Sequence, residues 1–167
     1  MLKPNYIGII AGILAFVSIA LPWWTFSASA TGLTAVSYDL YLYQVGTIVD
    51  VTIETWFVWT ALALIIIGGI FAIVGSIMAK GKTILLGGGV LALLSIIIFA
   101  VGLQMELSKI PVSGIGLFSG GSISMGEVTM NWSSYLSYGF WIALVAAIIA
   151  FVAFVKHPTE AAAAPPS

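Results

Sequence analysis

The sequence contains no cysteine among its 167 residues, and this absence excludes several kinds of chemistry. Without a thiol the chain has no disulfide, no cysteine nucleophile and no cysteine-ligated metal. Any folded segment outside the helices must therefore be held by strand pairing and by packing rather than by a covalent link.

Charge is also scarce, because only 7% of the residues are Asp, Glu, Lys or Arg, compared with about 25% in a soluble domain. Hydrophobic residues make up 61% of the chain, and its mean hydropathy is +1.18. These values predict an integral membrane protein. The formal net charge of −1 predicts no basic patch for nucleic acid or anionic lipid, so we expect no nucleic-acid partner.

Four apolar runs of about 20 residues are each long enough to cross a hydrocarbon core of about 30 Å as a helix. We expect one membrane domain with spans at 6–24, 56–79, 83–105 and 135–155, outer loops at 25–55 and 106–134, an inner loop at 80–82 and a cytoplasmic tail at 156–167. A second interpretation takes the first run as a cleavable signal peptide ending near Ala28-Ser29-Ala30. Pro22-Trp23-Trp24 fits a membrane-interface anchor better than a cleavage region, so we interpret the first run as a retained span.

The positions of the lysines predict the orientation of the chain. Lys3 precedes the first span, Lys80 and Lys82 lie between the second and third, and Lys156 follows the fourth, whereas the first outer loop has no Lys or Arg. The positive-inside rule therefore places both termini and the short middle loop in the cytoplasm, as in a multi-pass protein of the cell membrane. Lys109 is the one lysine that this arrangement puts outside.

Tryptophans gather near the predicted outer ends of the first, second and fourth spans. The indole ring favours the membrane interface, because the ring is apolar and its N–H needs a partner. The candidates for interface anchors are Pro22, Trp23, Trp24, Trp56, Trp59, Trp132 and Trp141. One interpretation is an aromatic belt, and the alternative is that some of these rings line a groove for lipid or for a partner.

Small residues recur every four positions inside the predicted spans, and such stripes let helix backbones approach closely. The candidates for helix packing are Gly8, Gly12, Gly68, Ala72, Gly139 and Ala143. We interpret them as the inner seams of one four-helix bundle. The alternative is that they contact other copies or other subunits.

The outer loops are rich in β-forming residues and predict a small antiparallel sheet of four or five strands. The candidate strands are 25–33, which ends in a Thr31-Gly32 turn, 36–45, 47–54 with clean apolar and polar alternation, 114–118 and 123–132. Ser119-Gly120-Gly121-Ser122 predicts a hairpin turn between the last two, because adjacent glycines accept positive φ. Asn131-Trp132-Ser133 matches an N-glycosylation sequon, which makes Asn131 a candidate glycosylation site, although such tripeptides are common by chance.

Ionisable side chains are missing from the predicted spans except near their ends, and Gln104 is the only strongly polar residue there. Proton relays and ion pathways need ionisable groups at membrane depth, so we do not expect a one-chain channel or pump. His157 is expected at the surface of the tail. We expect no catalytic residue, metal or cofactor, and hence no enzyme, unless the chain is a non-catalytic subunit of an enzyme complex.

The end of the first span carries a resemblance to a known family. Leu21-Pro22-Trp23-Trp24-Thr25, the four predicted helices and the longer, strand-bearing first outer loop resemble the claudin and peripheral myelin protein group of tetraspan proteins. Gly32-Leu33 matches part of the claudin first-loop signature, but Thr34 replaces its tryptophan and its two cysteines are missing. The resemblance implies an extracellular antiparallel sheet continuous with a four-helix bundle, cytoplasmic termini and lateral self-association.

These observations favour a non-catalytic tetraspan protein that makes lateral or facing protein–protein contacts, as a structural, adhesion or envelope component. Its expected partners are membrane lipids and either further copies of itself or other membrane subunits. The alternative is an accessory subunit of a larger membrane enzyme complex, whose helices contact lipid or quinone.

Overall fold

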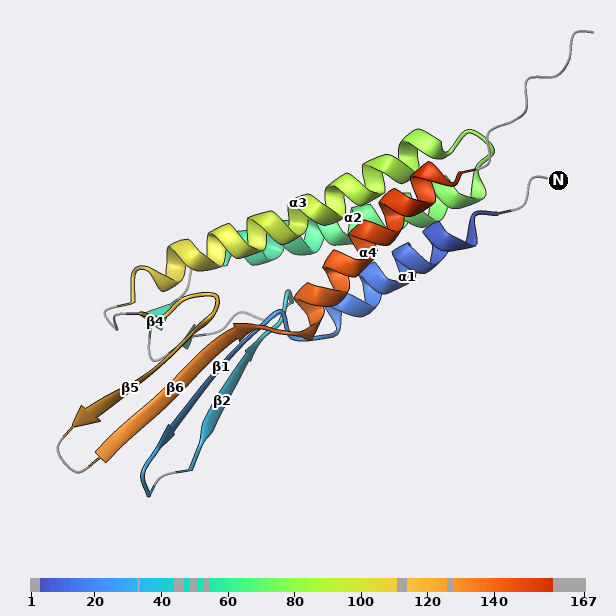
Figure 1. The fold of residues 1–167 in the computed structure, drawn as a ribbon. Helices are drawn as coiled ribbons and strands as arrows, with labels where there is room; N and C mark the ends of the chain where they lie inside the picture. The colour runs from blue at the N-terminus through green and yellow to red at the C-terminus, as the bar shows by residue number, and fades with distance from the viewer. Residues whose placement is uncertain are drawn as a thin grey trace, which may run out of the picture.

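The computed structural model consists of four packed helices with a β-sheet at one end of the bundle (Figure 1). It describes residues 4–32, 34–43, 47–48, 51–52, 55–110, 114–125 and 128–157. The elements in chain order are α1 (Tyr6–Ile19), β1 (Trp24–Ala30), β2 (Val36–Leu40), β3 (Thr47–Ile48), β4 (Val51–Thr52), α2 (Trp56–Ile77), α3 (Lys82–Leu107), β5 (Ser119–Met125), β6 (Val128–Leu136) and α4 (Tyr138–Val155). The prediction of four packed helices with a small antiparallel sheet is confirmed.

Helices α2, α3 and α4, with 22, 26 and 18 residues, are long and apolar enough to cross a membrane. Helix α1 has 14 residues, which corresponds to about 21 Å at the rise of an α-helix. This length is shorter than a hydrocarbon core of about 30 Å. The three long apolar helices indicate a multi-pass membrane protein.

The helices form a closed ring in chain order, because α1 packs on α2 and α4, and α3 packs on the same two helices. The backbones of α2 and α3 touch where Gly68 meets Gly88. A Cβ atom on Gly68 would lie 2.9 Å from the carbonyl oxygen of Gly88, and one on Gly88 would lie 2.8 Å from that of Gly68. A close approach of this kind compensates for the weak hydrophobic effect between helices in lipid.

The end of the bundle away from the sheet is tied together by Asn5, the buried residue that precedes α1. Its backbone N–H donates to Ser76 O at 2.9 Å, and its side-chain Nδ2 donates to Ala153 O at 2.8 Å. These bonds satisfy two carbonyls near the C-terminal ends of α2 and α4, which have no partner inside their own helices. The start of α1 is thereby fixed to two other helices.

The main sheet has the strand order β2-β1-β6-β5, and every neighbouring pair is antiparallel. Strand β1 follows α1, and β6 leads into α4, so the two central strands extend the two helices that lie side by side (Figure 1). Strands β3 and β4 form a separate pair. The connections from α1 to β1 and from β6 to α4 therefore lie next to each other.

Side chains alternate along the four strands and give the sheet two different faces. The apolar face carries Trp24, Phe26, Ala28 and Ala30 of β1, Val36, Tyr38 and Leu40 of β2, and Val128, Met130, Trp132, Ser134 and Leu136 of β6. Its half nearest the helices belongs to the main core, together with residues at the sheet end of α3 such as Phe99, Leu103 and Leu107. The polar face carries Thr25, Ser27, Ser29, Ser37, Asp39, Ser122, Ser124, Thr129, Asn131, Ser133 and Tyr135.

Two helix ends differ by three residues or more from the predicted spans. The segment 6–24 is helical only to Ile19, because Pro22 cannot continue the helical hydrogen bonds and Trp24 already pairs with Leu40 and Leu136. The segment 135–155 is helical only from Tyr138, since the two residues before Ser137 complete β6. Strand pairing extends closer to the helices than hydropathy alone indicated.

The strand predictions are partly wrong. The segment 47–54 contains two separate two-residue strands, β3 and β4, instead of one alternating strand, and residues 49–50 and 53–54 lie outside the described residues. The predicted strand 36–45 ends at Leu40. The Thr31-Gly32 turn is confirmed, since Gly32 has a φ of 80°.

The hairpin turn predicted at Ser119–Ser122 is also wrong, because these residues belong to β5 and the chain reverses between Met125 and Val128. Gly121 pairs with Trp132 on the neighbouring strand. A Cβ atom on Gly121 would lie 3.0 Å from Cζ2 of the Trp132 ring. The glycine thus makes room for an indole that covers it, and it is not needed for a turn.

Replacing Gly121 with valine is expected to displace the Trp132 ring and to weaken the β5–β6 pairing by about 1–3 kcal/mol, the usual cost of overpacking. Thermal unfolding of the purified protein measures this change. Ser122→Val is the matched control, because it adds the same side chain at the next position of β5, on the polar face, and is expected to have little effect. Equal stability of the two variants would contradict the role assigned to Gly121.

Candidate functional site

The hinge between α1 and β1 is built around Trp23, whose side chain is fully buried. Its ring packs edge-on against Phe99 of α3 at 5.1 Å and against Phe140 of α4 at 6.1 Å between ring centroids. Its Nε1–H donates to Ser18 O at 2.9 Å. One side chain therefore connects three helices at the level where the sheet begins.

The backbone of the hinge is bonded just as closely. The N–H of Trp23 donates to Leu40 O at 2.8 Å, and its carbonyl accepts from the N–H of Ser137 at 2.9 Å. The carbonyl of Pro22 accepts from the N–H of Gly139 at 2.8 Å. A Cβ atom on Gly139 would lie 2.7 Å from Leu21 O. These bonds fix the entry of β1 and the start of α4 against each other.

Trp24 is also fully buried and lies on the apolar face of the sheet, where it begins a row of stacked rings. It stacks on Phe26 at 6.1 Å, and Phe26 stacks on Trp132 at 6.4 Å. The Nε1 of Trp24 and the hydroxyl of Tyr38 are buried and have no hydrogen-bond partner in the described part of the chain. Burial raises the pKa of Tyr38 above its usual value of 10.0, so the phenol stays protonated at neutral pH.

The predicted interface anchors fall into two groups. Pro22 lies at the hinge, and Trp23, Trp24 and Trp132 contact the protein interior. By contrast, Trp56 and Trp59 of α2 and Trp141 of α4 are about half exposed at the sheet ends of their helices. Only this second group has the exposure that an interface anchor needs, and its interface role remains a prediction.

All six candidates for helix packing lie at contacts inside the bundle. The space for a side chain at Gly8 is taken by Ser76, and at Gly12 it is closed by Gly69 O at 2.7 Å. Gly68 and Ala72 both face Gly88, Gly139 faces the hinge, and Ala143 is fully buried. Other helices of the same chain therefore pack against these small-residue stripes.

Lys109, the one lysine predicted to lie outside, forms an ion pair with a buried carboxylate. Lys109 Nζ lies 2.6 Å from Oε1 of Glu106, whose side chain is 6% exposed, at the sheet end of α3. The pair carries no net charge. The positive-inside rule counts Lys and Arg and gives acidic residues little weight, so Lys109 remains the one lysine at the end that the other lysines predict to be outside.

The prediction that His157 lies at the surface is wrong, because its side chain is buried. Its Nε2 lies 3.2 Å from Gly75 O, and since a carbonyl accepts, the ring is the donor. His157, two residues beyond the end of α4, thus satisfies a carbonyl near the C-terminal end of α2. Across the described ranges, no group of three or more His, Cys, Asp or Glu side chains could hold a metal ion.

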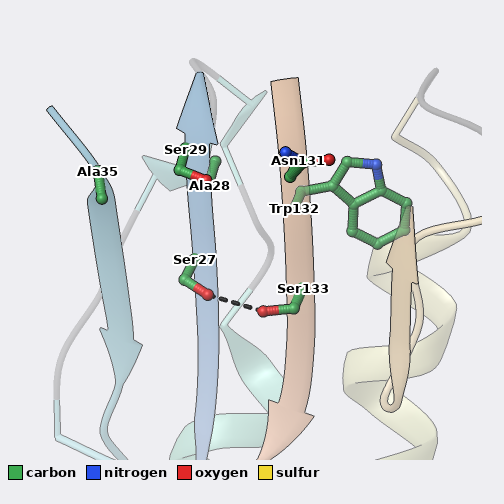
Figure 2. A pocket seen from close by; sticks show the side chains of 7 residues that line it. All are labelled: Ser27, Ala28, Ser29, Ala35, Asn131, Trp132 and Ser133. Carbon is green, nitrogen blue, oxygen red and sulfur yellow. Dashed lines mark hydrogen bonds between the residues drawn. The ribbon is translucent and has the colours of Figure 1, made fainter. Parts of the chain in front are cut away.

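The polar face of the sheet is covered by short hydroxyl and amide side chains (Figure 2). Ser27 and Ser133 share a hydrogen bond of 2.8 Å between strands β1 and β6, and Thr25 donates to Asp39 at 2.7 Å. A shallow pocket of about 270 Å³ is lined by Ser27, Ala28, Ser29, Ala35, Asn131, Trp132 and Ser133. Asn131, the candidate glycosylation site, is exposed on this face.

The apolar face is covered near the helices and open at its far end. Val36 is 66% exposed and Val128 is 43% exposed, although both belong to the face that forms the core further along the strands. A hollow of about 140 Å³ is lined by Ala28, Ser29, Ala30, Thr34, Val36 and Met130. We call the side chains of Ala30, Val36, Val128 and Met130 the distal apolar patch.

A comparison with models of known protein families found no match, and a comparison with curated proteins found none either.

The sequence predicted the hinge, but not the burial of Trp23 and Trp24 or the division of the sheet into two faces. The alternation from Trp24 to Ala30 was a usable signal, because every second residue is a small or aromatic apolar one and the others are Thr or Ser. The distal apolar patch could not be read from the sequence. Its members come from three strands, and their exposure depends on where the helices end.

Proposed function

We propose that this protein is a non-catalytic tetraspan membrane protein that makes lateral or facing contacts through its outer sheet, as a structural, adhesion or envelope component. The observation that carries the proposal is the distal apolar patch. A cluster of exposed apolar side chains at one end of a sheet face is a candidate surface for protein contacts. Val36 and Val128 belong to strands, so bilayer lipid does not account for their exposure as it does for the helices.

The partner we favour is a second copy of the chain. The small-residue stripes of the helices are filled inside the bundle and are therefore not open for contacts between copies. No charged side chain of the described strands points to the apolar face, so two such patches can meet without burying an unpaired charge. Copies in the same membrane also meet at high local concentration.

The orientation and the number of spans belong to the same proposal. With α1 and the hinge as the first of four spans, Lys80, Lys82 and Lys156 lie on the cytoplasmic side of the cell membrane and the sheet lies outside. Lys109, which pairs with Glu106, is the one lysine that this orientation places outside. The arrangement resembles that of claudin-like tetraspans in its hinge motif and in the sheet that continues from the bundle.

The double variant Val36→Lys/Val128→Lys is expected to convert homo-oligomers in mild detergent into monomers, because each lysine charge would have to be buried at the contact. Light scattering after size-exclusion chromatography gives the mass of the protein part, in multiples of 17.6 kDa. The matched control is Ser37→Lys/Ser122→Lys, which adds the same charges on the polar face and is expected to keep the oligomer.

Two results would contradict the proposal. One is a wild-type protein that is monomeric at every concentration, in detergent and in native membranes. The other is a stable complex of fixed stoichiometry with unrelated chains, which would favour the accessory subunit of a larger membrane complex.

A further inference from the structure

A shallow pocket lies at the start of α4, where β6 passes into the helix. It has a volume of about 180 Å³ and is lined by Tyr135, Leu136, Ser137, Tyr138 and Trp141. Ser137 is the N-cap residue of α4, and α4 is long and apolar enough to cross a membrane. Its 18 residues correspond to about 27 Å, close to a hydrocarbon core of about 30 Å. The pocket at the end of this helix therefore lies at headgroup level.

The pocket contains a polar side chain that the chain itself does not satisfy. Ser137 is only 5% exposed, and a serine at an N-cap usually accepts a hydrogen bond from an N–H group of the first helical turn. Ser137 makes no such side-chain bond, and its hydroxyl has no other partner in the described part of the chain. A nearly buried hydroxyl without a partner is costly. Because the side chain lines the pocket, a ligand there can accept its hydrogen bond.

The backbone at the start of α4 provides a second donor. The first N–H groups of a helix have no partner inside it, and the helix dipole makes this end positive. The N–H of Ser137 donates to Trp23 O at 2.9 Å, and that of Gly139 donates to Pro22 O at 2.8 Å. The N–H of Tyr138, between them, donates to no carbonyl of the described residues. A hydroxyl and an N–H group at a helix N-terminus are suited to binding a phosphate.

Three aromatic side chains line the rest of the pocket. Tyr135 is 45%, Tyr138 74% and Trp141 46% exposed. The Nε1–H of Trp141 donates to Leu136 O at 3.1 Å, which fixes the orientation of the indole ring. Rings of tyrosine and tryptophan attract cations, and aromatic cages of these residues recognise quaternary ammonium groups. The pocket thus combines donors for a phosphate with rings for an ammonium group.

The charge around the pocket favours a zwitterionic headgroup over an anionic one. The segments 25–55 and 106–134 contain five acidic residues and one lysine, namely Asp39, Asp50, Glu54, Glu106, Glu127 and Lys109. Asp39 lies on the same side of the sheet as the pocket residue Tyr135, because both pair with Thr25 of β1. An excess of acidic residues repels a headgroup with a net negative charge. A phosphocholine group has no net charge, and its ammonium end is attracted.

We propose that this pocket binds the phosphocholine headgroup of a phospholipid, with the phosphate at the Ser137 hydroxyl and the Tyr138 N–H. The trimethylammonium group lies against the rings of Tyr135, Tyr138 and Trp141. The acyl chains stay in the bilayer, since the pocket is smaller than the roughly 300–1,000 Å³ of a site that encloses a drug-sized ligand. This inference does not depend on the proposed contacts between copies.

The test uses the full chain in a detergent without a phosphocholine group, titrated with phosphatidylcholine or with phosphatidylglycerol of the same acyl chains and followed by native mass spectrometry. The wild type is expected to retain one phosphatidylcholine in preference to phosphatidylglycerol. Ser137→Ala is expected to weaken phosphatidylcholine binding about tenfold, for the loss of one hydrogen bond to a charged group. It should hardly change thermal unfolding, because Ser137 makes no cap bond.

Ser133→Ala is the matched control, because it makes the same exchange in β6, outside the pocket, and is expected to leave binding unchanged. Tyr138→Leu removes one ring and is expected to weaken phosphatidylcholine binding about threefold, whereas Tyr138→Phe keeps the ring and should bind like the wild type. Equal retention of the two lipids by the wild type, or equal effects of Ser137→Ala and Ser133→Ala, would overturn the proposal. Displacement of the lipid by equimolar glycerophosphocholine would overturn the lipid as the occupant and indicate a soluble phosphocholine compound.

Discussion

Trp23→Ala is expected to destabilise the protein by about 3–5 kcal/mol, the range for truncating a large buried aromatic side chain. The ring is fully buried between Phe99 and Phe140, so its removal leaves a cavity where three helices meet. The substitution also removes the hydrogen bond that Nε1–H of Trp23 donates to Ser18 O. A loss of this size should lower the midpoint of thermal unfolding in mild detergent by about 10 °C.

Two further variants separate the contributions of the ring and of its hydrogen bond. Trp23→Phe keeps most of the aromatic volume and loses the donor, so a cost of about 1–2 kcal/mol is expected. Trp56→Ala removes the same side chain from a position that is 52% exposed, and its expected cost is below about 1 kcal/mol. If Trp23→Ala and Trp56→Ala unfolded at the same temperature, the hinge would not be the centre of the packing.

Gly139→Val is expected to have a comparably large effect for the opposite reason, since it adds atoms where none fit. Its Cβ would meet Leu21 O at 2.7 Å and Ser18 O at 2.8 Å, and the ring of Trp23 lies closer still. Backbone oxygens cannot rotate away as a side chain can, so the start of α4 must move from the hinge. The expected cost is about 3 kcal/mol or more, at the upper end of the range for overpacking.

Gly87, another helical glycine, provides the control, because a substitution there is expected to stabilise the protein instead of destabilising it. At Gly87 the nearest atom to an added Cβ would be a ring carbon of Phe71 at 3.4 Å, an ordinary van der Waals contact. Gly87→Ala should therefore keep the fold and gain up to about 1 kcal/mol from the higher helix propensity of alanine. Thermal unfolding of both variants beside the wild type checks the prediction. Equal tolerance at the two positions would show that α4 does not need its close approach to the hinge.

Most of the architecture could be predicted from the sequence because two strong signals coincide. The hydropathy of the long runs fixed α2, α3 and α4 to within a few residues, and Pro22 located the change from helix to strand. Helix ends were harder, since a run such as Tyr135 and Leu136 is apolar whether it pairs in a sheet or continues a helix. Hydropathy does not distinguish the two, but hydrogen bonds to a neighbouring strand do.

The pattern Gly120-Gly121 shows why the sheet could be predicted and its turn could not. Adjacent glycines are a strong turn signal in a local reading of the chain. Here they are in β5 because Trp132, eleven positions later, covers Gly121 from the neighbouring strand. Such a contact depends on tertiary structure. The distal apolar patch is of the same kind, since it combines residues from three separate strands.

The absence of native cysteine makes disulfide cross-linking in native membranes the most direct test of the proposed contact between copies. Two differently tagged populations of the chain would be produced together, one with Val36→Cys and one with Val128→Cys, each alone and in combination. Disulfide-linked pairs that carry the tags of this chain are the expected result. Ser122→Cys, on the polar face, should remain uncross-linked. Cross-links from Ser122→Cys as strong as those from the two patch positions, or none from either patch position, would contradict contacts through the distal apolar patch.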